Sequence, residues 1–597
     1  MAPFSRRHFL VATGLSAAAV RLRAQDPYAE DVILRAMKDE LERSRQLRVV
    51  GGGGDDTPYF ISYTLDDTDA FEVNASFGAV TAVNRNRFRL PNIEVRVGSY
   101  DFDNTGHIYS GLYSGSRYDT EPLPLDDDYR ALREGLWLAT DYAYKAAVES
   151  IARKRAALTN MAVSAEKIPD FTKADRFESL AKITHSKLDE GAWTARMVKH
   201  SAIFDAYPEV LASGVEFHFN QDTTYYLDTD GTALRYADDA AWIFARAEGQ
   251  SADGMVLRDT LAAPAFNLAK LPPDGELHAS ITTLARNIKD LVNAPVGESF
   301  TGPVLFEPQA AAQLLAQLLG DNLRITRKPI SDPNRPVNII ASEFEGRTGS
   351  RVLPEWIDVV DDPTQTSYQA KPLAGFYPFD FEGVKPEPVA VIQKGVLKTF
   401  LTTRQPTKNL RASNGHGRFP AGFGARAAAI GNLFVKPAQT TPMVELKTRL
   451  IQMCKERDKP YGLLIRKLDF PFSGGNAEIQ TLQTGSANSG GSVRPVSPPI
   501  LMYRVYPDGR EELVRGLRFK DFSAKDLRDI SLASDQPYVL NYVTNGSGFN
   551  HSEATPNATT TSVIAPSLLL DSVDLVRAEN EPGKLPLVPA PALSPQQ

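Results

Sequence analysis

The stretch from Gly302 to Leu315 constrains the fold most, because an apolar strand pattern runs there directly into a helix pattern. Residues 303–306 are all apolar, which is typical of a short buried strand. Pro308 then suits the first turn of a helix, where a backbone N–H has no intrahelical partner. One face of this helix is apolar: Ala311, Leu314, Leu315 and Leu318. The sequence therefore predicts a buried strand that leads straight into a helix.

Helical and strand patterns both occur along the rest of the chain. Apolar residues recur at helical spacing in three segments: 28–48, 129–155 and 278–292. The second of these helices ends in Arg153–Arg155, whose charges suit its C-terminal dipole. Strand alternation occupies 58–66, 69–75, 92–99 and 214–263, and short strands dominate after residue 300. These patterns predict an α+β fold, with an N-terminal domain of strands plus long helices and a strand-rich C-terminal domain.

The N-terminal residues have the pattern of an export signal. The twin arginines Arg6 and Arg7 precede a weakly apolar run, Phe9–Val20, which is shorter than the roughly 20 residues needed to span a bilayer. Basic residues follow, and Ala24 suits a cleavage site. We expect a twin-arginine signal peptide and a periplasmic or otherwise exported protein. The alternative is an ordinary basic start to a cytosolic protein.

Length, charge and cysteine content set the domain plan. We expect a signal peptide at 1–24, an N-terminal domain at 25–292, a C-terminal domain at 293–580 and a disordered, proline-rich tail at 581–597. The net charge of −7 gives no basic surface for nucleic acid, and no later apolar run is long enough to cross a membrane. The single cysteine, Cys454, excludes an internal disulfide and is expected to be a buried apolar residue.

Glycines and charged residues gather in a block of the C-terminal half. Its segments are Asp361–Thr364, Phe379–Gly383, Gly395–Leu397, Arg404 and Ser413–Arg418. Their order and spacing resemble the C-terminal domain of the TldD/PmbA family, which is also called the modulator of DNA gyrase family. That family contains zinc peptidases and partners of theirs, of the TldE/PmbA type, that have lost the zinc site. The resemblance covers residues 300–577 and is faint over 28–290.

The resemblance implies that this chain lacks the zinc site. Zinc-bearing members have His-Glu-x-x-x-His at the strand-to-helix junction, where the metal lowers the pKa of a bound water to about 7. Here the two histidine positions hold Phe306 and Ala311, which offer no lone pair to a metal. The family's further ligand is a cysteine near the C-terminus, and the matching stretch Val539–Gly546 has none. We expect no cofactor, with Glu307 left as a relic of the general base that can pair with an arginine.

The same resemblance implies a peptide-binding role. Family members hold an extended peptide by its backbone, as an added strand. Four positions match the family's pattern and become candidate contacts to substrate or partner: Arg404, Asn414, His416 and Arg418. The alternative for these residues is a loop fixed by its own hydrogen bonds.

The implied function is an exported, peptide-binding subunit that works with a TldD-type zinc peptidase and is inactive in proteolysis on its own. One alternative is an active metallopeptidase with substituted ligands, whose metal site would be assembled from distant residues. Another is modulation of DNA gyrase, the family's older label, which conflicts with export and with the acidic charge.

Overall fold

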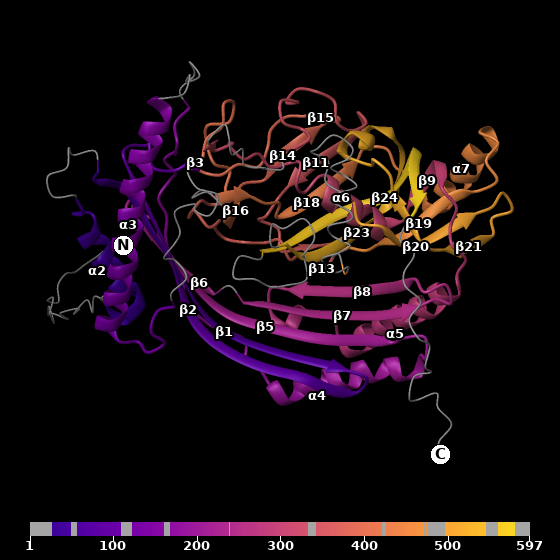
Figure 1. Ribbon diagram of the computed structural model, residues 1–597, viewed down its shortest axis with the longest axis horizontal. Helices are drawn as coiled ribbons and strands as arrows, with labels where there is room; N and C mark the ends of the chain where they lie inside the picture. The colour runs from indigo at the N-terminus through magenta and orange to yellow at the C-terminus, as the bar shows by residue number, and fades with distance from the viewer. Residues whose placement is uncertain are drawn as a thin grey trace, which may run out of the picture.

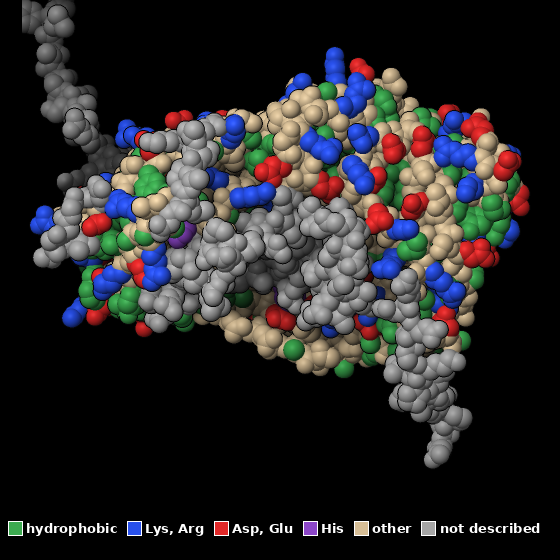
Figure 2. All heavy atoms as spheres, turned by 45° about the horizontal axis from the view of Figure 1, so that its top comes forward, with side chains coloured by type: hydrophobic (Ala, Val, Ile, Leu, Met, Phe, Trp, Pro, Cys, Tyr) green, Lys and Arg blue, Asp and Glu red, His purple; other side chains and the backbone are tan. Residues whose placement is uncertain are grey.

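Two large sheets, one from each half of the chain, dominate the fold (Figure 1). The computed structural model describes residues 27–48, 56–108, 122–159, 168–237, 239–331, 342–420, 426–470, 473, 496–544 and 559–578. The predicted signal peptide and proline-rich tail lie outside these residues. Helices and strands are both abundant, which confirms the α+β class. On the face drawn in Figure 2, basic and acidic side chains are interspersed.

The first sheet is organised around β5 (Ala212–Asp228), which pairs antiparallel with β1 (Pro58–Ser76) along one side. β1 in turn pairs with the edge strand β2 (Ala79–Val97). On its other side, β5 pairs with β7 through its first half and with β6 through its second half. β8 pairs with β7, and β4 pairs with β6. The bounds of these four strands are β4 (Glu178–Leu180), β6 (Ala233–Ala237), β7 (Ala240–Gln250) and β8 (Val256–Ala265).

Two strands of this sheet are longer than the sequence predicts. β1 runs without a break through the predicted gap between 58–66 and 69–75, because polar residues there pair with polar residues of β5. Asp66, for example, accepts a hydrogen bond from the Thr224 hydroxyl at 2.8 Å. β2 begins at Ala79 rather than at residue 92, since its first half is an exposed edge without apolar alternation. Apolar alternation is therefore a weak signal where a strand is polar or lies at an edge.

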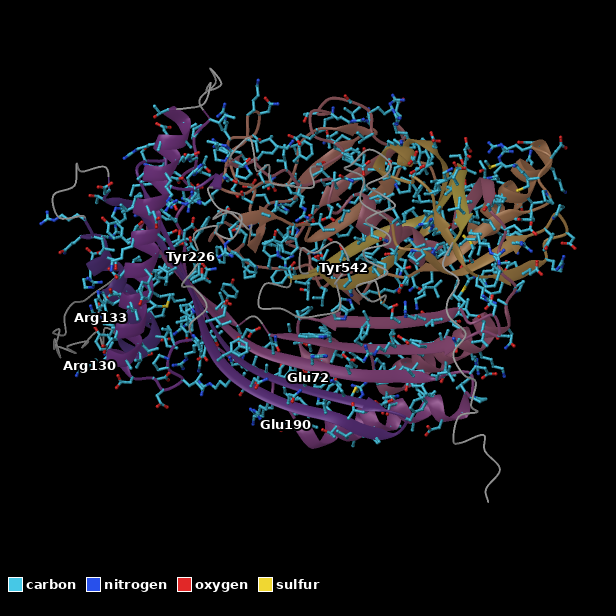
Figure 3. The ribbon with its side chains drawn as sticks, in the orientation of Figure 1. Glu72, Arg130, Arg133, Glu190, Tyr226 and Tyr542 are labelled. Carbon is cyan, nitrogen blue, oxygen red and sulfur yellow. The ribbon has the colours of Figure 1, made fainter. Side chains whose placement is uncertain are left out.

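Helices cover the outer face of the first sheet (Figure 1). Their bounds are α2 (Val32–Ser44), α3 (Tyr129–Thr159), α4 (Glu190–Ser201) and α5 (Asp274–Asn293). α2, α3 and α5 confirm the three predicted helices. Tyr225 and Leu227 of β5 pack with α2 and α3, whereas Phe217 and Phe219 pack with α4 and α5. Because all four are odd-numbered, the even-numbered residues of β5 face the inner side, toward the second sheet. Figure 3 labels Glu190 at α4.

The second sheet is mixed, and β24 (Thr559–Arg577) is its longest strand. β24 pairs antiparallel with β9 (Phe300–Phe306) and β23 (Ile530–Thr544), and parallel with β18 (Asn432–Pro437). The other strands of this sheet are β11 (Ile357–Asp361), β14 (Val389–Gln393), β15 (Val396–Leu397), β19 (Gly462–Leu468), β20 (Pro499–Val505), β21 (Glu511–Val514) and β22 (Leu517–Phe519). Short strands dominate this sheet, as predicted, and the exceptions are β23 and β24, which are long strands that pair with each other.

Helices α6 (Pro308–Leu318) and α7 (Met443–Glu456) lie on opposite faces of the second sheet. Phe306 of β9 belongs to the apolar cluster that includes α6, whereas the preceding Leu305 packs with α7. β9 is therefore covered on both sides, which confirms the predicted buried strand and helix. Short elements complete the fold: α1 (Pro27–Glu30), β3 (His107–Ile108), β10 (Ile330–Ser331), β12 (Ser367–Tyr368), β13 (Lys371–Pro372), β16 (Gly417–Pro420), β17 (Arg426–Ala428) and the 3-10 helices at 202–206, 268–270 and 524–529.

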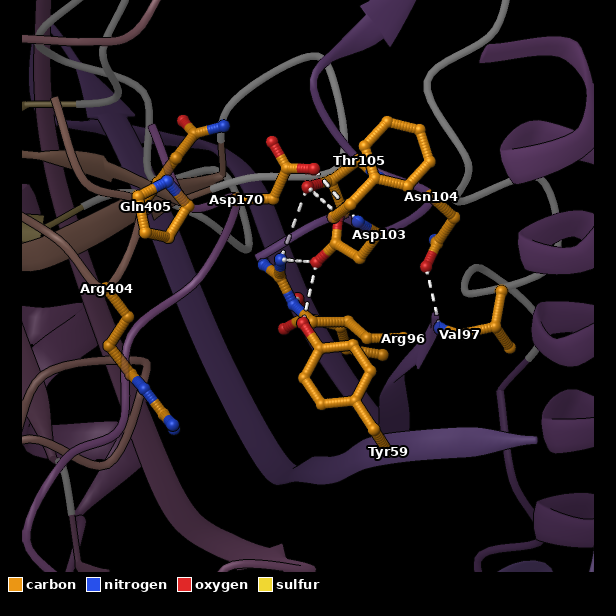
Figure 4. A network of polar contacts seen from close by, with 12 residues as sticks. Tyr59, Arg96, Val97, Asp103, Asn104, Thr105, Asp170, Arg404 and Gln405 are labelled. Carbon is orange, nitrogen blue, oxygen red and sulfur yellow. Dashed lines mark hydrogen bonds and ion pairs between the residues drawn. The ribbon is translucent and has the colours of Figure 1, made fainter. Parts of the chain in front are cut away.

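A buried polar network lies beside α3, where the two halves of the chain meet (Figure 4). Asp103 accepts hydrogen bonds from Tyr59 at 2.7 Å and from Arg96 at 2.8 Å. Lys154 of α3 donates to the Asp103 carbonyl oxygen at 3.0 Å and to Asp170 Oδ2 at 2.5 Å. The interpretation of Lys154 as a helix-end charge is therefore wrong, because its side chain is buried and neutralises the carboxylate of Asp170, which lies beyond the end of α3.

The network continues into the second half of the chain through two arginines. Arg327 lies 3.0 Å from Asp170. The ring of Phe171 lies between the guanidinium groups of Arg96 and Arg404, at 3.7 Å and 4.1 Å from the ring centroid. Arg96 comes from the first half and Arg404 from the second, and such cation–π contacts contribute about 2 kcal/mol each where water is excluded. The network therefore fixes how the two sheets sit against each other.

Replacing Lys154 with Met should destabilise the protein strongly, because Asp170 would lose one of its cations inside the buried network. We expect a loss of about 3–5 kcal/mol in the free energy of unfolding, measured by denaturant titration. Lys145→Met is the matched control on the same helix, where the exposed pair with Asp141 should contribute less than about 1 kcal/mol. Equal effects of the two substitutions would contradict a central role for the network.

Candidate functional site

The strand-to-helix junction at Glu307 lies at the centre of the second sheet. β9 places Phe306 between β24 and β19, opposite Leu568 and Ile465. Glu307 then occupies the N-cap of α6, and Pro308 takes the first turn as the sequence predicted. The two positions that matter for a metal site, 306 and 311, therefore belong to rigid elements at the middle of the fold.

Both of these positions are filled by apolar packing. Phe306 is fully buried, and its ring stacks with Phe519 and Phe522 at centroid distances of 6.1 Å and 6.4 Å. Ala311 is also fully buried, and α6 is buried on all its sides over residues 310–316. A zinc ion needs nitrogen, sulfur or oxygen lone pairs in tetrahedral reach, and these side chains have none. The residues present do not fit the metal.

Glu307 is engaged in a chain of alternating charges. Both of its carboxylate oxygens lie 3.2 Å from Arg466 Nε. The pairing of Glu307 with an arginine agrees with the prediction from the sequence. Arg466 also donates to Glu511 at 2.6 Å, and Glu511 accepts from Lys447 at 2.6 Å. The Arg466 guanidinium lies 4.2 Å from the ring centroid of Tyr503. Glu307 is therefore tied to a cation rather than presented to a reacting water.

The remaining sulfur and nitrogen ligands are dispersed. Cys454 is buried in α7, on the other face of the sheet from α6, and burial raises the pKa of its thiol to about 11. Six histidines fall within the described residues, at 107, 185, 200, 218, 278 and 416, while those at 8 and 551 lie outside them. Across the part of the chain that the structure describes, no three His, Cys, Asp or Glu side chains are arranged to hold a metal ion.

The glycine-rich block folds into a tight turn over two buried carboxyl groups. Asp380 accepts a hydrogen bond from the Gly417 N–H at 2.9 Å, and Glu382 accepts one from the Arg404 N–H at 2.6 Å. A Cβ at Gly417 would lie 2.8 Å from Glu382 Oε2 and 3.1 Å from Asp380 Oδ2, so only glycine fits there. Burial raises the pKa of both carboxyl groups, and Asp380 raises that of Glu382 further.

Three predicted substrate residues lie together in this turn and bond to their own chain. The Asn414 side chain accepts from the Thr402 N–H at 2.8 Å. His416 is fully buried, with Nδ1 at 2.9 Å from the Asn414 carbonyl oxygen. Arg418 donates to the Thr560 carbonyl oxygen at 3.0 Å and packs over the Tyr377 ring at 4.2 Å. Their substrate role stays a prediction, and the geometry favours the alternative of a loop fixed by its own hydrogen bonds.

Burial sets the protonation of the pair behind this loop. The His416 Nε2 atom lies 3.7 Å from Asp361 Oδ2, and both side chains are inaccessible to solvent. Burial lowers the pKa of His416 to about 3, so this imidazole is neutral at physiological pH. Burial raises the pKa of Asp361 to about 7, although its carboxylate accepts a hydrogen bond from the Gly431 N–H at 2.8 Å. The pair is buried, and Asp361 is its member that titrates near neutrality.

The fourth predicted residue, Arg404, lies where the two halves of the chain meet. It lies in a bend, three residues after an isolated bridge at Leu401. Its side chain is 1% exposed and donates to Asp230 at 2.8 Å and to the Thr172 carbonyl oxygen at 2.9 Å. Sequence reasoning missed this role, because Asp230 and Thr172 are far from Arg404 along the chain and belong to no recognisable motif.

Comparison with protein families identifies the second half of the chain. A family model described as the PmbA/TldA metallopeptidase C-terminal domain matches residues 299–485, which include the junction at Glu307 and the whole glycine-rich block. This part of the chain is a C-terminal domain of the TldD/PmbA family. The match confirms the resemblance seen in the sequence.

Two curated proteins that are similar to part of this chain are named metalloproteases. One, from Archaeoglobus fulgidus, is 37% identical over 78 residues, which are 13% of this chain and 17% of that protein. The other, from Methanocaldococcus jannaschii, is 33% identical over 97 residues, or 16% of this chain and 20% of that protein. The matched part thus spans a fifth or less of these relatives.

Solved structures of family members have the same fold. A protein from Thermotoga maritima described as a modulator of DNA gyrase has a TM-score of 0.53 and 16% identity, covering 87% of this chain and 96% of its own. TldE from Thermococcus kodakarensis has a TM-score of 0.53 and 12% identity, covering 91% of this chain and 100% of its own. At these identities the likeness is one of fold, and it extends to the N-terminal half where the sequence resemblance is faint.

Replacing Asp361 with Asn should make stability less dependent on pH. Because burial raises the pKa of Asp361, the folded state holds this proton more tightly than the unfolded state does. The resulting stabilisation is complete below the unfolded pKa and is lost as the pH rises through about 7. Each unit of pKa difference is worth about 1.4 kcal/mol, so the wild type should lose at least about 1 kcal/mol relative to the variant between about pH 5 and pH 8.

Denaturant unfolding of both proteins at the two pH values measures this change. A difference in unfolding free energy that stays constant with pH would contradict the raised pKa of Asp361.

Proposed function

We propose that this chain is a peptide-binding member of the TldD/PmbA family that does not hydrolyse peptides itself. It acts as the non-catalytic subunit beside a zinc-bearing relative, which supplies the hydrolytic site. The observation that carries this proposal is the apolar packing of Phe306 and Ala311 at the two metal-ligand positions. Family membership and a fold shared with TldE from Thermococcus kodakarensis support it.

The chemistry of peptide hydrolysis supports the same reading. In the zinc-bearing members the metal polarises the carbonyl group and generates hydroxide at neutral pH. Glu307 alone offers neither effect, and Arg466 lies against its carboxylate. Binding of an extended peptide needs only backbone hydrogen bonds along a sheet edge, and this requires no metal. Peptide recognition therefore remains available to the fold when hydrolysis is not.

The purified mature protein should contain far less than one zinc ion per chain after dialysis. Phe306 and Ala311 provide no ligand, so the metal has no site at the junction. Elemental analysis by mass spectrometry measures the content, with a zinc-bearing relative as the positive control. About one zinc ion per chain, lost on substitution of a single histidine, would instead support an active metallopeptidase with substituted ligands.

Replacing Glu307 with Gln should leave the peptidase activity of the assembled complex within about twofold of the wild type, because Glu307 is tied to Arg466 and activates no water. Steady-state cleavage of an unstructured peptide by the reconstituted complex measures this. The matched control is the same substitution at the general base of the zinc-bearing partner, which should abolish activity. Cleavage by the present chain alone that disappears in Glu307→Gln would place the active site here.

Export through the twin-arginine route forms part of the proposal. Arg6 and Arg7 before a weakly apolar run support it. Among the described residues, no helix is long and apolar enough to cross a membrane. Replacing both arginines with lysine should leave unprocessed precursor in the cytoplasm, as judged by fractionation and blotting. Unchanged export of that double variant would show that another route or no export applies.

A further inference from the structure

The inner face of the first sheet carries a transverse row of three side chains, one from each of three neighbouring strands. Glu72 on β1 lies opposite His218 on β5, and His218 lies opposite Trp242 on β7. Side chains directly opposite on antiparallel strands share one face at roughly 5 Å between their Cβ atoms. The neighbouring residues Val73 and Phe217 pack in the cluster under α4 and α5, so this row points to the inner side.

The aromatic members of the row leave one polar group without a partner. The rings of His218 and Trp242 stack with a centroid distance of 4.9 Å and an interplanar angle of 7°. Trp242 is only 6% exposed, and among the described residues its Nε1–H has no hydrogen-bond acceptor. A buried indole N–H usually donates a hydrogen bond to an acceptor. The carbonyl group of a bound ligand could supply the acceptor that this N–H lacks.

The acidic members of the inner face are unequally neutralised. Glu216 lies two residues before His218 on β5. Its carboxylate oxygens lie 3.4 Å from His218 Nε2 and 3.8 Å from Arg246 Nη2. Glu72 accepts a hydrogen bond from the Asn74 amide at 2.7 Å, and within the described residues no lysine or arginine lies within ion-pair distance of it. Glu72 is therefore a carboxylate on this face without a cationic partner among the described residues.

The inner face also lies between two places where the halves of the chain touch. At one end Tyr226 of β5 donates to the Glu382 carbonyl oxygen at 3.0 Å. At the other end Lys467 of β19 lies 2.6 Å from Asp259 of β8. Figure 1 shows the second sheet on the inner side of the curved first sheet, and Figure 3 labels Glu72 nearer to it than Glu190. A chain bound on this face would therefore lie between the two halves.

We propose that the row of Glu72, His218 and Trp242 binds a basic residue of the peptide substrate. The cationic side chain pairs with Glu72 and packs on the aromatic stack, while a neighbouring peptide carbonyl accepts the Trp242 Nε1–H. This inference rests on the proposed peptide-binding function and deepens it, because it assigns the preference to peptides that carry lysine or arginine. The cationic side chain of the ligand matches the negative charge of Glu72, and its peptide carbonyl matches the Trp242 N–H.

Fluorescence anisotropy of labelled peptides tests this preference with the full mature chain. One probe is a short glycine–serine peptide with a central arginine, and the other has citrulline, the uncharged isostere, at that position. At low ionic strength the wild type should bind the arginine peptide at least about tenfold more tightly. Glu72→Gln should remove most of this preference while binding of the citrulline peptide stays unchanged.

Glu190→Gln is the matched control, because Glu190 is a carboxylate on the outer side near α4 and pairs with Arg85. It should leave both affinities unchanged. Trp242→Phe keeps an aromatic ring but removes the N–H, so it should weaken the binding of both peptides by a similar factor. Near-ultraviolet circular dichroism verifies that each variant is folded.

The outcomes separate the two levels of the proposal. Equal binding of the two peptides by the wild type, or a preference that survives Glu72→Gln, overturns the role of the row while peptide binding itself stands. Saturable binding of neither peptide overturns the proposed function and this inference with it.

Discussion

The packing of β9 and α6 at the centre of the second sheet determines both the fold and the chemistry that this chain can perform. Phe306 stacks with two further phenylalanines, and Ala311 lies in a helix that is buried on all its sides. A metal ligand at either position would bring a polar group into this packing, at a cost of several kcal/mol unless the metal offset it. The arrangement that closes the sheet therefore leaves no place for zinc, and Glu307 forms an ion pair instead.

The contacts between the two halves follow from a different kind of interaction. Arg404 and Phe171 belong to a buried network in which cations, carboxylates and an aromatic ring neutralise one another. Removing one member of such a network leaves an uncompensated buried charge, so the halves are held in a specific relation. That relation places the inner face of the first sheet opposite the second. On that face Glu72 has no cationic partner among the described residues and the Trp242 N–H has no acceptor there, and these are the two groups of the proposed peptide contact.

Local signals predicted the parts of the fold that local chemistry determines. The apolar run before Pro308 predicts a strand, and the periodic apolar residues of α3 predict a helix. Both patterns depend on residues that are only a few positions apart in the sequence. Lys154 was misread because its partners, Asp103 and Asp170, are remote in sequence. The family resemblance located the metal-ligand positions, and the residue types found there, Phe306 and Ala311, offer no ligand. Whether His416 touches a substrate could not, because a buried loop and a binding loop both need the flanking glycines.

Recovery of a peptide after incubation with this chain alone is the most direct measurement of whether it binds without hydrolysing. Anisotropy should show saturable binding of an unstructured basic peptide, and mass spectrometry should then recover that peptide intact, with or without added zinc. Both results together would separate recognition from hydrolysis in a single preparation. Cleavage of the peptide by the chain alone, stopped by a metal chelator and restored by zinc, would contradict a non-catalytic subunit.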